Sequence, residues 1–178
     1  MRIVAGTARG RKLLAPRGVA TRPTGDKVRG AVMNLLGQFF QGGRVLDLYA
    51  GSGAMALEAL SRGCERATCV EGNRAAAEAL AHNAAACGFA DRLEIRRERV
   101  EEALARLPRG AFDLAFLDPP YAEGPDRALS ALEPLLSPGA LAVAEHDRRR
   151  PPAERHGRLR LLDRRAYGGT GISIYRLE

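Results

Sequence analysis

The sequence of 178 residues contains no tryptophan, only three cysteines and no long uninterrupted apolar run. Cys64, Cys69 and Cys87 form no Cys-x-x-Cys pair and have no histidines nearby at the spacing of zinc ligands. We therefore expect neither a disulfide framework nor a metal site. No stretch approaches the roughly 18 apolar residues of a membrane span, and no signal-peptide pattern opens the chain. These absences favour a cytoplasmic protein that does not contact a membrane.

Lysine is also scarce, since 26 of the 28 basic residues are arginine. The formal net charge of +7 is unevenly divided: residues 1–30 carry +7, residues 31–147 carry −6 and residues 148–178 carry +6. Although a general preference for arginine would explain the composition, two basic flanks around an acidic body are typical of a protein that contacts nucleic acid. The expected phosphate contacts of the N-terminal flank are Arg9, Arg11, Lys12, Lys27 and Arg29.

The middle of the chain has the pattern of an α/β fold. With 46% hydrophobic residues, the chain is long enough for one domain with a sizeable core. Apolar runs predict strands near residues 44–49, 66–71, 92–96, 112–118 and 139–146, and helical patterns lie between them near 54–63, 73–88, 100–107 and 126–136. This βαβ series predicts a doubly wound, mostly parallel sheet that is covered by helices on both faces.

Both ends of the chain depart from this pattern. Residues 1–20 contain two short apolar patches among glycine and basic residues, which predicts a small hairpin or an extended arm. Thr24 is the expected N-cap of a helix whose apolar residues, from Val28 to Phe39, share one face and which ends near residues 41–43. Residues 157–178 resemble an antiparallel hairpin added to the sheet. We expect a basic extension, residues 1–40, packed on residues 41–178 as effectively one domain.

A small-residue turn follows the first predicted strand, which contains Asp47. The turn consists of Ala50, Gly51, Ser52 and Gly53. In open α/β sheets, ligands bind beyond the carboxyl ends of the strands, where glycines let the backbone approach them closely. The next strand ends at Glu71, 20 residues after Gly51, where a carboxylate can accept hydrogen bonds from ribose hydroxyls. A cofactor that contains a nucleoside is therefore expected at this turn.

Two kinds of cofactor fit the turn. Gly51, Gly53 and Ala56 satisfy the GxGxxG/A fingerprint of nicotinamide-dependent oxidoreductases. Asp47 opposes that interpretation, because a carboxylate just ahead of the turn would repel a pyrophosphate. S-adenosylmethionine carries a sulfonium and an ammonium and has no phosphate. The charge pattern favours this cofactor and leaves the NAD-dependent oxidoreductase as an alternative.

The stretch FDLAFLDPPYAEG ends an apolar strand in an acid, two prolines and a tyrosine. Proline cannot donate to a sheet ladder, so the strand must stop there. The Asp118 carboxylate and the Pro119 carbonyl can each accept one N–H of an aryl amine, while Pro119 and Pro120 stiffen the backbone between them. Tyr121 can stack on an extruded base. The motif predicts catalysis at an exocyclic amine.

Three histidines form no cluster and are expected at the surface or at helix flanks: His82, His146 and His156.

Together, VLDLYAGSGAMALEALSRG and DPPY resemble the class I S-adenosylmethionine-dependent methyltransferases that modify exocyclic amines. With RGRKL, RPTGDKVRGAVMNLL and the terminal YGGT, the chain is similar over nearly its whole length to the bacterial small-subunit rRNA (guanine-N2)-methyltransferases of the RsmD type. The resemblance implies a Rossmann-like fold with a seven-stranded sheet, S-adenosylmethionine as cofactor, and no metal. It also implies a cytoplasmic enzyme, expected as a monomer, that acts on 16S rRNA alone or within an assembled small ribosomal subunit.

The resemblance implies further roles for single residues. Arg22 and Thr24 lie in the run that closes over the methionine end of the cofactor and helps to present the RNA. After the third strand, where the family presents an acid toward the adenine, either Glu98 or Arg99 occupies the equivalent position. Gly30 stands where the family usually has a glutamate.

Two other functions remain open. A DNA adenine or cytosine amino-methyltransferase would share the chemistry, but 178 residues leave no room for a separate target-recognition domain. A nucleic-acid-binding module with a vestigial cofactor site would share the basic flanks without needing the DPPY motif.

Overall fold

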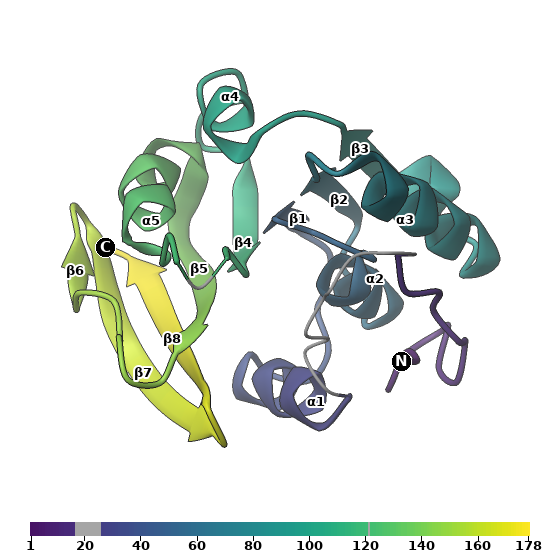
Figure 1. Ribbon diagram of the computed structural model, residues 1–178, viewed down its shortest axis with the longest axis horizontal. Helices are drawn as coiled ribbons and strands as arrows, with labels where there is room; N and C mark the ends of the chain where they lie inside the picture. Colours follow the sequence, from purple (N-terminus) through teal and green to yellow (C-terminus); the bar gives the residue numbers. More distant parts are fainter. Residues whose placement is uncertain (17–25, 121) are drawn as a thin grey trace.

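The computed structural model describes residues 1–16, 26–120 and 122–178, and these residues build one eight-stranded sheet (Figure 1). The strands are β1 Arg44–Leu48, β2 Arg66–Val70, β3 Leu93–Arg96, β4 Phe112–Leu117, β5 Leu136–Asp147, β6 Arg155–His156, β7 Leu159–Tyr167 and β8 Thr170–Leu177. Their order is β3-β2-β1-β4-β5-β8-β7-β6, with parallel pairing from β3 to β5 and antiparallel pairing beyond it. The strand order reverses between β1 and β4, which is where such sheets bind ligands.

Helices cover both faces of the sheet. They are α1 Asp26–Leu35, α2 Ala54–Ser61, α3 Arg74–Ala86, α4 Val100–Leu104 and α5 Asp126–Leu132, with short 3-10 turns at Ala90–Arg92 and Glu133–Leu135. Leu57 of α2 shares an apolar cluster with Val45 of β1, whereas Leu129 of α5 shares the opposite cluster with Leu46. Because neighbouring residues of β1 are buried on opposite faces, the predicted doubly wound fold is confirmed. None of the described helices is both long and apolar enough to cross a membrane.

The C-terminal hairpin forms as predicted, with β7 and β8 antiparallel and β8 paired to β5. The sheet has eight strands instead of the predicted seven, because Arg155 and His156 pair with Arg160 and Leu159. The sequence of residues 148–157, which connects β5 to β7, has no strand pattern of its own. Arg155 and His156 pair with the edge of β7 that does not face β8. Without them, this edge would expose a row of unpaired backbone donors and acceptors.

The surface positions predicted for His146 and His156 are wrong. Their exposed fractions are 3% and 6%, because strands β5 and β6 carry them into the interior. His146 Nδ1 donates to the carbonyl of Asp147 at 2.9 Å and Nε2 lies 2.9 Å from Ser173 Oγ, and burial lowers the pKa of this imidazole. His156 packs edge-on against Tyr175. The residues of β8 that contact these rings, Ser173 and Tyr175, lie 27 and 19 residues later in the sequence.

The N-terminal residues form the predicted hairpin in a minimal version. Arg2 and Lys12 make an isolated antiparallel bridge, and the Ile3 N–H donates to the Arg11 carbonyl at 2.9 Å. The side chain of Ile3 is buried in the core cluster that contains α1, α2 and α3. The first residues of the chain are therefore packed on the sheet layer.

Helix α1 ends at Leu35, several residues before the predicted end. Gln38 adopts a φ of 66°, in the left-handed region, so the helical hydrogen-bond pattern cannot continue. Phe39, which was expected on the apolar helix face, is 62% exposed. The predicted N-cap, Thr24, lies outside the described residues.

Candidate active site

Asp47 and the glycine turn lie at the carboxyl end of β1. Asp47 is 4% exposed, and its Oδ2 accepts a hydrogen bond from the N–H of Ala56 in α2 at 3.1 Å. Gly51 and Gly53 have φ values of 55° and 78°, which favour glycine. A Cβ on Gly53 would lie 2.8 Å from Leu80 Cδ1, whereas a Cβ on Gly51 would meet no described atom within 4 Å. Packing thus requires glycine at position 53, and the backbone at position 51 stays open to a ligand.

Glu71, at the end of β2, joins the glycine turn to the next loop. Its Oε2 accepts the N–H of Gly51 and its Oε1 accepts the N–H of Asn73, each at 2.7 Å. Asn73 then caps α3 by accepting the N–H of Ala76 at 3.0 Å. The structure therefore brings Glu71 to the turn, while its contact with a ribose stays a prediction.

Asn83 ties the glycine turn to the N-terminal residues, a link that sequence analysis missed. This fully buried residue of α3 donates from Nδ2 to the carbonyls of Ser52 and Leu14, both at 3.0 Å. Its Oδ1 accepts the Leu14 N–H at 2.8 Å. On the other side of the turn, the Ala50 N–H donates to Val70 of β2 at 3.1 Å. The only sequence signal was an asparagine within an alanine-rich helix.

Asp118 immediately follows β4 and lies level with Glu145 of the neighbouring strand, because Leu117 pairs with Ala144. The alternation of side chains along the strands directs both carboxyls to the sheet face of Asp47. Asp118 itself is exposed to solvent. Partial loss of hydration beside the neighbouring strands raises the pKa of Asp118 to about 8, and the charges of Glu145 and Asp47 add to the increase.

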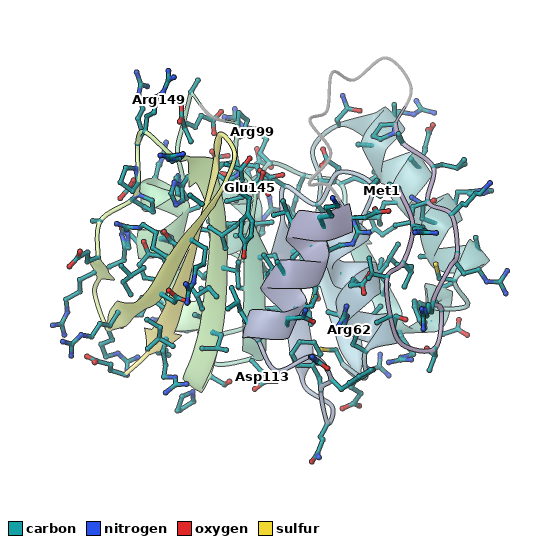
Figure 2. The ribbon with its side chains drawn as sticks, turned by 90° about the horizontal axis from the view of Figure 1, so that it is seen from below. Met1, Arg62, Arg99, Asp113, Glu145 and Arg149 are labelled. Carbon is teal, nitrogen blue, oxygen red and sulfur yellow. The ribbon has the colours of Figure 1, made fainter. Side chains whose placement is uncertain are left out.

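Four carboxyl groups thus gather at the carboxyl edge of the sheet: Asp47, Glu71, Asp118 and Glu145. Figure 2 shows Glu145 and Arg99 at this edge and Asp113 at the opposite one. Burial raises the pKa of Asp47 to about 7, with a smaller contribution from the charge of Glu71, against the effect of the Ala56 N–H. Shifts of this kind are concentrated at functional sites. A cation bound here would stabilise the charged carboxylates, whereas a phosphate would be repelled.

The backbone turns sharply after Asp118. Pro119 is buried and Pro120 is exposed. The Pro120 carbonyl accepts the N–H groups of Glu123 and Gly124 at 2.9 and 3.3 Å. Tyr121 lies outside the described residues, as do Arg22 and Thr24, so their roles stay predictions.

Two cavities open near this edge among the described residues. The larger, about 650 Å³, lies between α4 and α5 and is lined by residues that include Tyr49, Arg99, Glu101, Glu123 and Arg127. It borders the glycine turn through Tyr49, but Asp47, Glu71 and Asp118 do not line it. The smaller cavity, about 220 Å³, is lined by residues that include Pro119. We assign the chemistry to the carboxyl groups beside the turn, because the larger cavity lacks them.

The two candidates for the adenine contact follow β3. Glu98 accepts a hydrogen bond from Arg96 Nε at 2.6 Å and lies 2.9 Å from Arg106 Nη2. The Arg96 hydrogen bond is the main reason that the pKa of Glu98 is lowered. Arg99 is exposed and lines the larger cavity. Both assignments stay predictions, and Glu98 already has two cationic partners.

The predicted RNA contacts divide into two groups. Four are exposed: Arg9, Arg11, Lys12 and Lys27. The prediction for Arg29 is wrong, because its side chain is fully buried in α1. It donates to the carbonyl of Arg2 and pairs with Asp26 at 3.0 Å and Glu58 at 3.4 Å. Arg29 is therefore a structural cation.

Glu58 of α2 is the centre of that buried cluster and was not singled out from the sequence. Its carboxylate accepts the backbone N–H groups of Val4 and Ala5 at 2.8 and 3.0 Å. It also pairs with Arg62 at 2.8 Å, in addition to Arg29. The cluster attaches both the N-terminal residues and α1 to the sheet layer. Gly30, the departure noted above, has only Val4 Cγ1 near its hypothetical Cβ, at 3.8 Å.

Comparisons with known proteins point in one direction. The sequence profile of the family described as "Conserved hypothetical protein 95" matches residues 1–176. "Putative rRNA methyltransferase YlbH" of Bacillus subtilis (strain 168) is 39% identical over 181 residues, which cover 99% of this chain and 98% of that protein. "Ribosomal RNA small subunit methyltransferase D" of Haemophilus influenzae is 32% identical over 182 residues, which cover 99% of this chain and 92% of that protein. The solved structure of "Putative methyltransferase yhhF from Escherichia coli" is 31% identical, with a TM-score of 0.86 over 100% of this chain and 98% of that one.

Proposed function

Because the chain belongs to the family described as Conserved hypothetical protein 95, we propose that it is an S-adenosylmethionine-dependent methyltransferase that modifies the exocyclic N2 amine of a guanine in 16S ribosomal RNA. Relatives that align over nearly the whole chain are named as rRNA methyltransferases. The choice of guanine N2 is supported by the resemblance of the N-terminal and DPPY motifs to the RsmD-type enzymes. The proposal includes a cytoplasmic monomer that acts on the RNA alone or within a small subunit.

The observation that carries the cofactor assignment is the gathering of carboxyl groups at the sheet edge. A pyrophosphate beside the glycine turn would face Asp47 and Glu71, and like charges in a partly buried site repel strongly. A sulfonium and an ammonium would instead stabilise the ionised forms of Asp47 and Asp118, whose pKa values are raised to about 7 and about 8. This contrast disfavours the NAD-dependent oxidoreductase.

When bound, S-adenosylmethionine supplies a methyl group on a positively charged sulfur. The glycine turn and Glu71 would hold its nucleoside, and Asp47 would face its cationic part. The Asp118 carboxylate and the Pro119 carbonyl would accept the two N–H groups of the guanine amine and orient its nitrogen. Asp118 would also stabilise the positive charge that develops there and accept the departing proton, since its raised pKa makes it a stronger base than an ordinary aspartate.

The substrate assignment predicts a single missing modification. We expect 16S rRNA from cells that lack this protein to lose one N2-methylguanosine, as measured by nuclease digestion and mass spectrometry. The purified protein with labelled cofactor should restore the methyl group on that rRNA and should not label duplex DNA. Labelling of DNA in place of RNA would support the DNA amino-methyltransferase, and full methylation in the deleted strain would contradict the proposal.

Glu71→Gln is expected to weaken binding of S-adenosylhomocysteine. Glutamine has one acceptor oxygen where Glu71 has two, so either the Gly51 or the Asn73 N–H loses its partner and the turn is displaced. We expect a loss of about 1–3 kcal/mol, roughly 5- to 150-fold in affinity, as measured by isothermal titration calorimetry. Glu78→Gln, at an exposed site of α3, is the matched control and should bind as the wild type does. Equal affinities for all three proteins would exclude Glu71 from the cofactor site.

A further inference from the structure

The connection between β5 and β6 begins with three consecutive exposed arginines, Arg148, Arg149 and Arg150. Its backbone is held in place at each of them. The Arg148 N–H donates to the Gly169 carbonyl at 3.1 Å. The Arg149 N–H donates to Asp147 Oδ1 at 2.8 Å, and the Arg150 N–H to the Asp147 carbonyl at 2.9 Å. Three guanidinium groups therefore project from a fixed turn.

This turn adjoins the catalytic edge. Arg150 lines the smaller cavity, about 220 Å³, together with Pro119, the proline whose carbonyl is proposed to accept an amine N–H. Glu145, which lies level with Asp118, lines the same cavity. Figure 2 shows Arg149 at the same edge of the molecule as Glu145 and Arg99. The cavity also contains three further carboxyl groups, those of Glu123, Asp126 and Asp147, so a phosphate would bind to the exposed guanidinium groups outside it. A polynucleotide whose base entered the site at Pro119 would pass beside Arg150.

The three arginines also differ in their ion pairs from the next arginines along the chain. Arg155 and Arg160 both pair with Glu178, at 3.6 and 3.2 Å, and Arg158 pairs with Glu133 at 2.7 Å. Among the described residues, no carboxylate forms an ion pair with Arg148, Arg149 or Arg150. A phosphate could therefore bind these guanidinium groups without displacing an existing anion. Their planar donors match phosphate oxygens in a bidentate geometry.

We propose that Arg148, Arg149 and Arg150 form a phosphate-binding face that holds the RNA backbone next to the target nucleotide, an inference that rests on the proposed function. The exposed residues of the N-terminal hairpin, Arg9 and Arg11, belong to another part of the molecule. The C-terminal basic segment, residues 148–178, would therefore contact the RNA through a second surface. The arginine face supplies affinity and position. It does not select the base, because phosphate contacts carry no sequence information.

The test compares two triple variants with the same change in charge. One carries Arg148→Gln, Arg149→Gln and Arg150→Gln, and the matched control carries Arg155→Gln, Arg158→Gln and Arg160→Gln. Binding of a 16S rRNA transcript is measured by fluorescence anisotropy over a series of salt concentrations. Losing three phosphate contacts should reduce the slope of log affinity against log salt by about 2 and lower affinity roughly 30-fold at low salt. The control should lose less than about threefold, because its cations are already paired.

Thermal denaturation and titration with S-adenosylhomocysteine accompany the binding data. Both readouts should match the wild type in the first variant, because the substituted side chains are exposed and lie outside the cofactor turn. An unchanged salt slope in this variant, or an equal loss in the control, would overturn the arginine face. If the wild-type protein methylated no RNA but the first variant alone lost RNA affinity, the arginine face would stand and the proposed function would fail.

Discussion

Asp118→Ala is expected to reduce the rate of methyl transfer about 100- to 1000-fold, because it removes the charged acceptor that distinguishes the transition state from the ground state. The Pro119 carbonyl would remain as the only acceptor of the pair. Binding of S-adenosylhomocysteine should change little, since the glycine turn and Glu71 do not hydrogen-bond to Asp118. Single-turnover methylation and calorimetry on the same preparation separate the two effects.

The ionisation of Asp118 gives this prediction a pH signature. Partial loss of hydration and the neighbouring carboxylates raise its pKa to about 8, so the protonated, less effective form is more populated at neutral pH than it is for an ordinary aspartate. We expect kcat/KM to rise as pH increases through about 8. A cationic cofactor favours the carboxylate, so the corresponding rise in kcat should lie at lower pH. Asp118→Asn keeps the size of the side chain and cannot ionise, so its residual activity should lack this rise.

The same ionisation affects stability with a defined sign. The folded protein retains the Asp118 proton up to about pH 8, whereas the unfolded chain releases it near the ordinary value of 3.8. The folded state therefore binds more protons between these values, and the free energy of unfolding falls as pH rises through this window. Asp118→Asn should remove part of that decline in denaturation experiments.

If the asparagine variant kept the full rate and the wild-type pH profile, the carboxylate would have no role in catalysis.

The βαβ part of the fold could be predicted because its signals are local. Strands β1 and β4 are buried on both faces, so they appear as apolar runs, and each ends in residues that cannot extend a sheet. Asp47, Glu71 and Asp118 could be assigned to one edge because the carboxyl ends of parallel strands meet there. Glu145 was missed, although it ends the apolar run of β5 as Asp118 ends that of β4.

The errors concern residues whose surroundings are supplied by distant parts of the chain. Arg29 belongs to a basic segment and was assigned to the surface, but Glu58, 29 residues later, forms the anionic partner that makes its burial possible. His156 is buried against the ring of Tyr175, 19 residues later in β8. Local charge and periodicity contain no information about such partners. The basic N-terminal flank therefore combines surface cations with a structural one.

Glu58→Ala is expected to be the most destabilising single substitution among those considered. It would leave Arg29 and Arg62, which are 0% and 4% exposed, without their shared carboxylate. Removing one partner of a buried ion pair typically costs about 3–5 kcal/mol. A typical domain has only about 5–15 kcal/mol of stability. The midpoint of thermal unfolding should therefore fall by roughly 10 °C or more.

The control for this prediction is Glu78→Ala, which removes an exposed carboxylate that pairs with Arg74 at 2.8 Å. Exposed pairs contribute about 0–1 kcal/mol, so this variant should unfold close to the wild type. Glu58 also accepts the N–H groups of Val4 and Ala5. Hydrogen exchange of these two amides should therefore become faster in Glu58→Ala and stay slow in Glu78→Ala. Equal unfolding free energies for both variants, with both amides still protected, would show that the N-terminal hairpin is held by its apolar contacts alone, chiefly those of the buried Ile3 side chain.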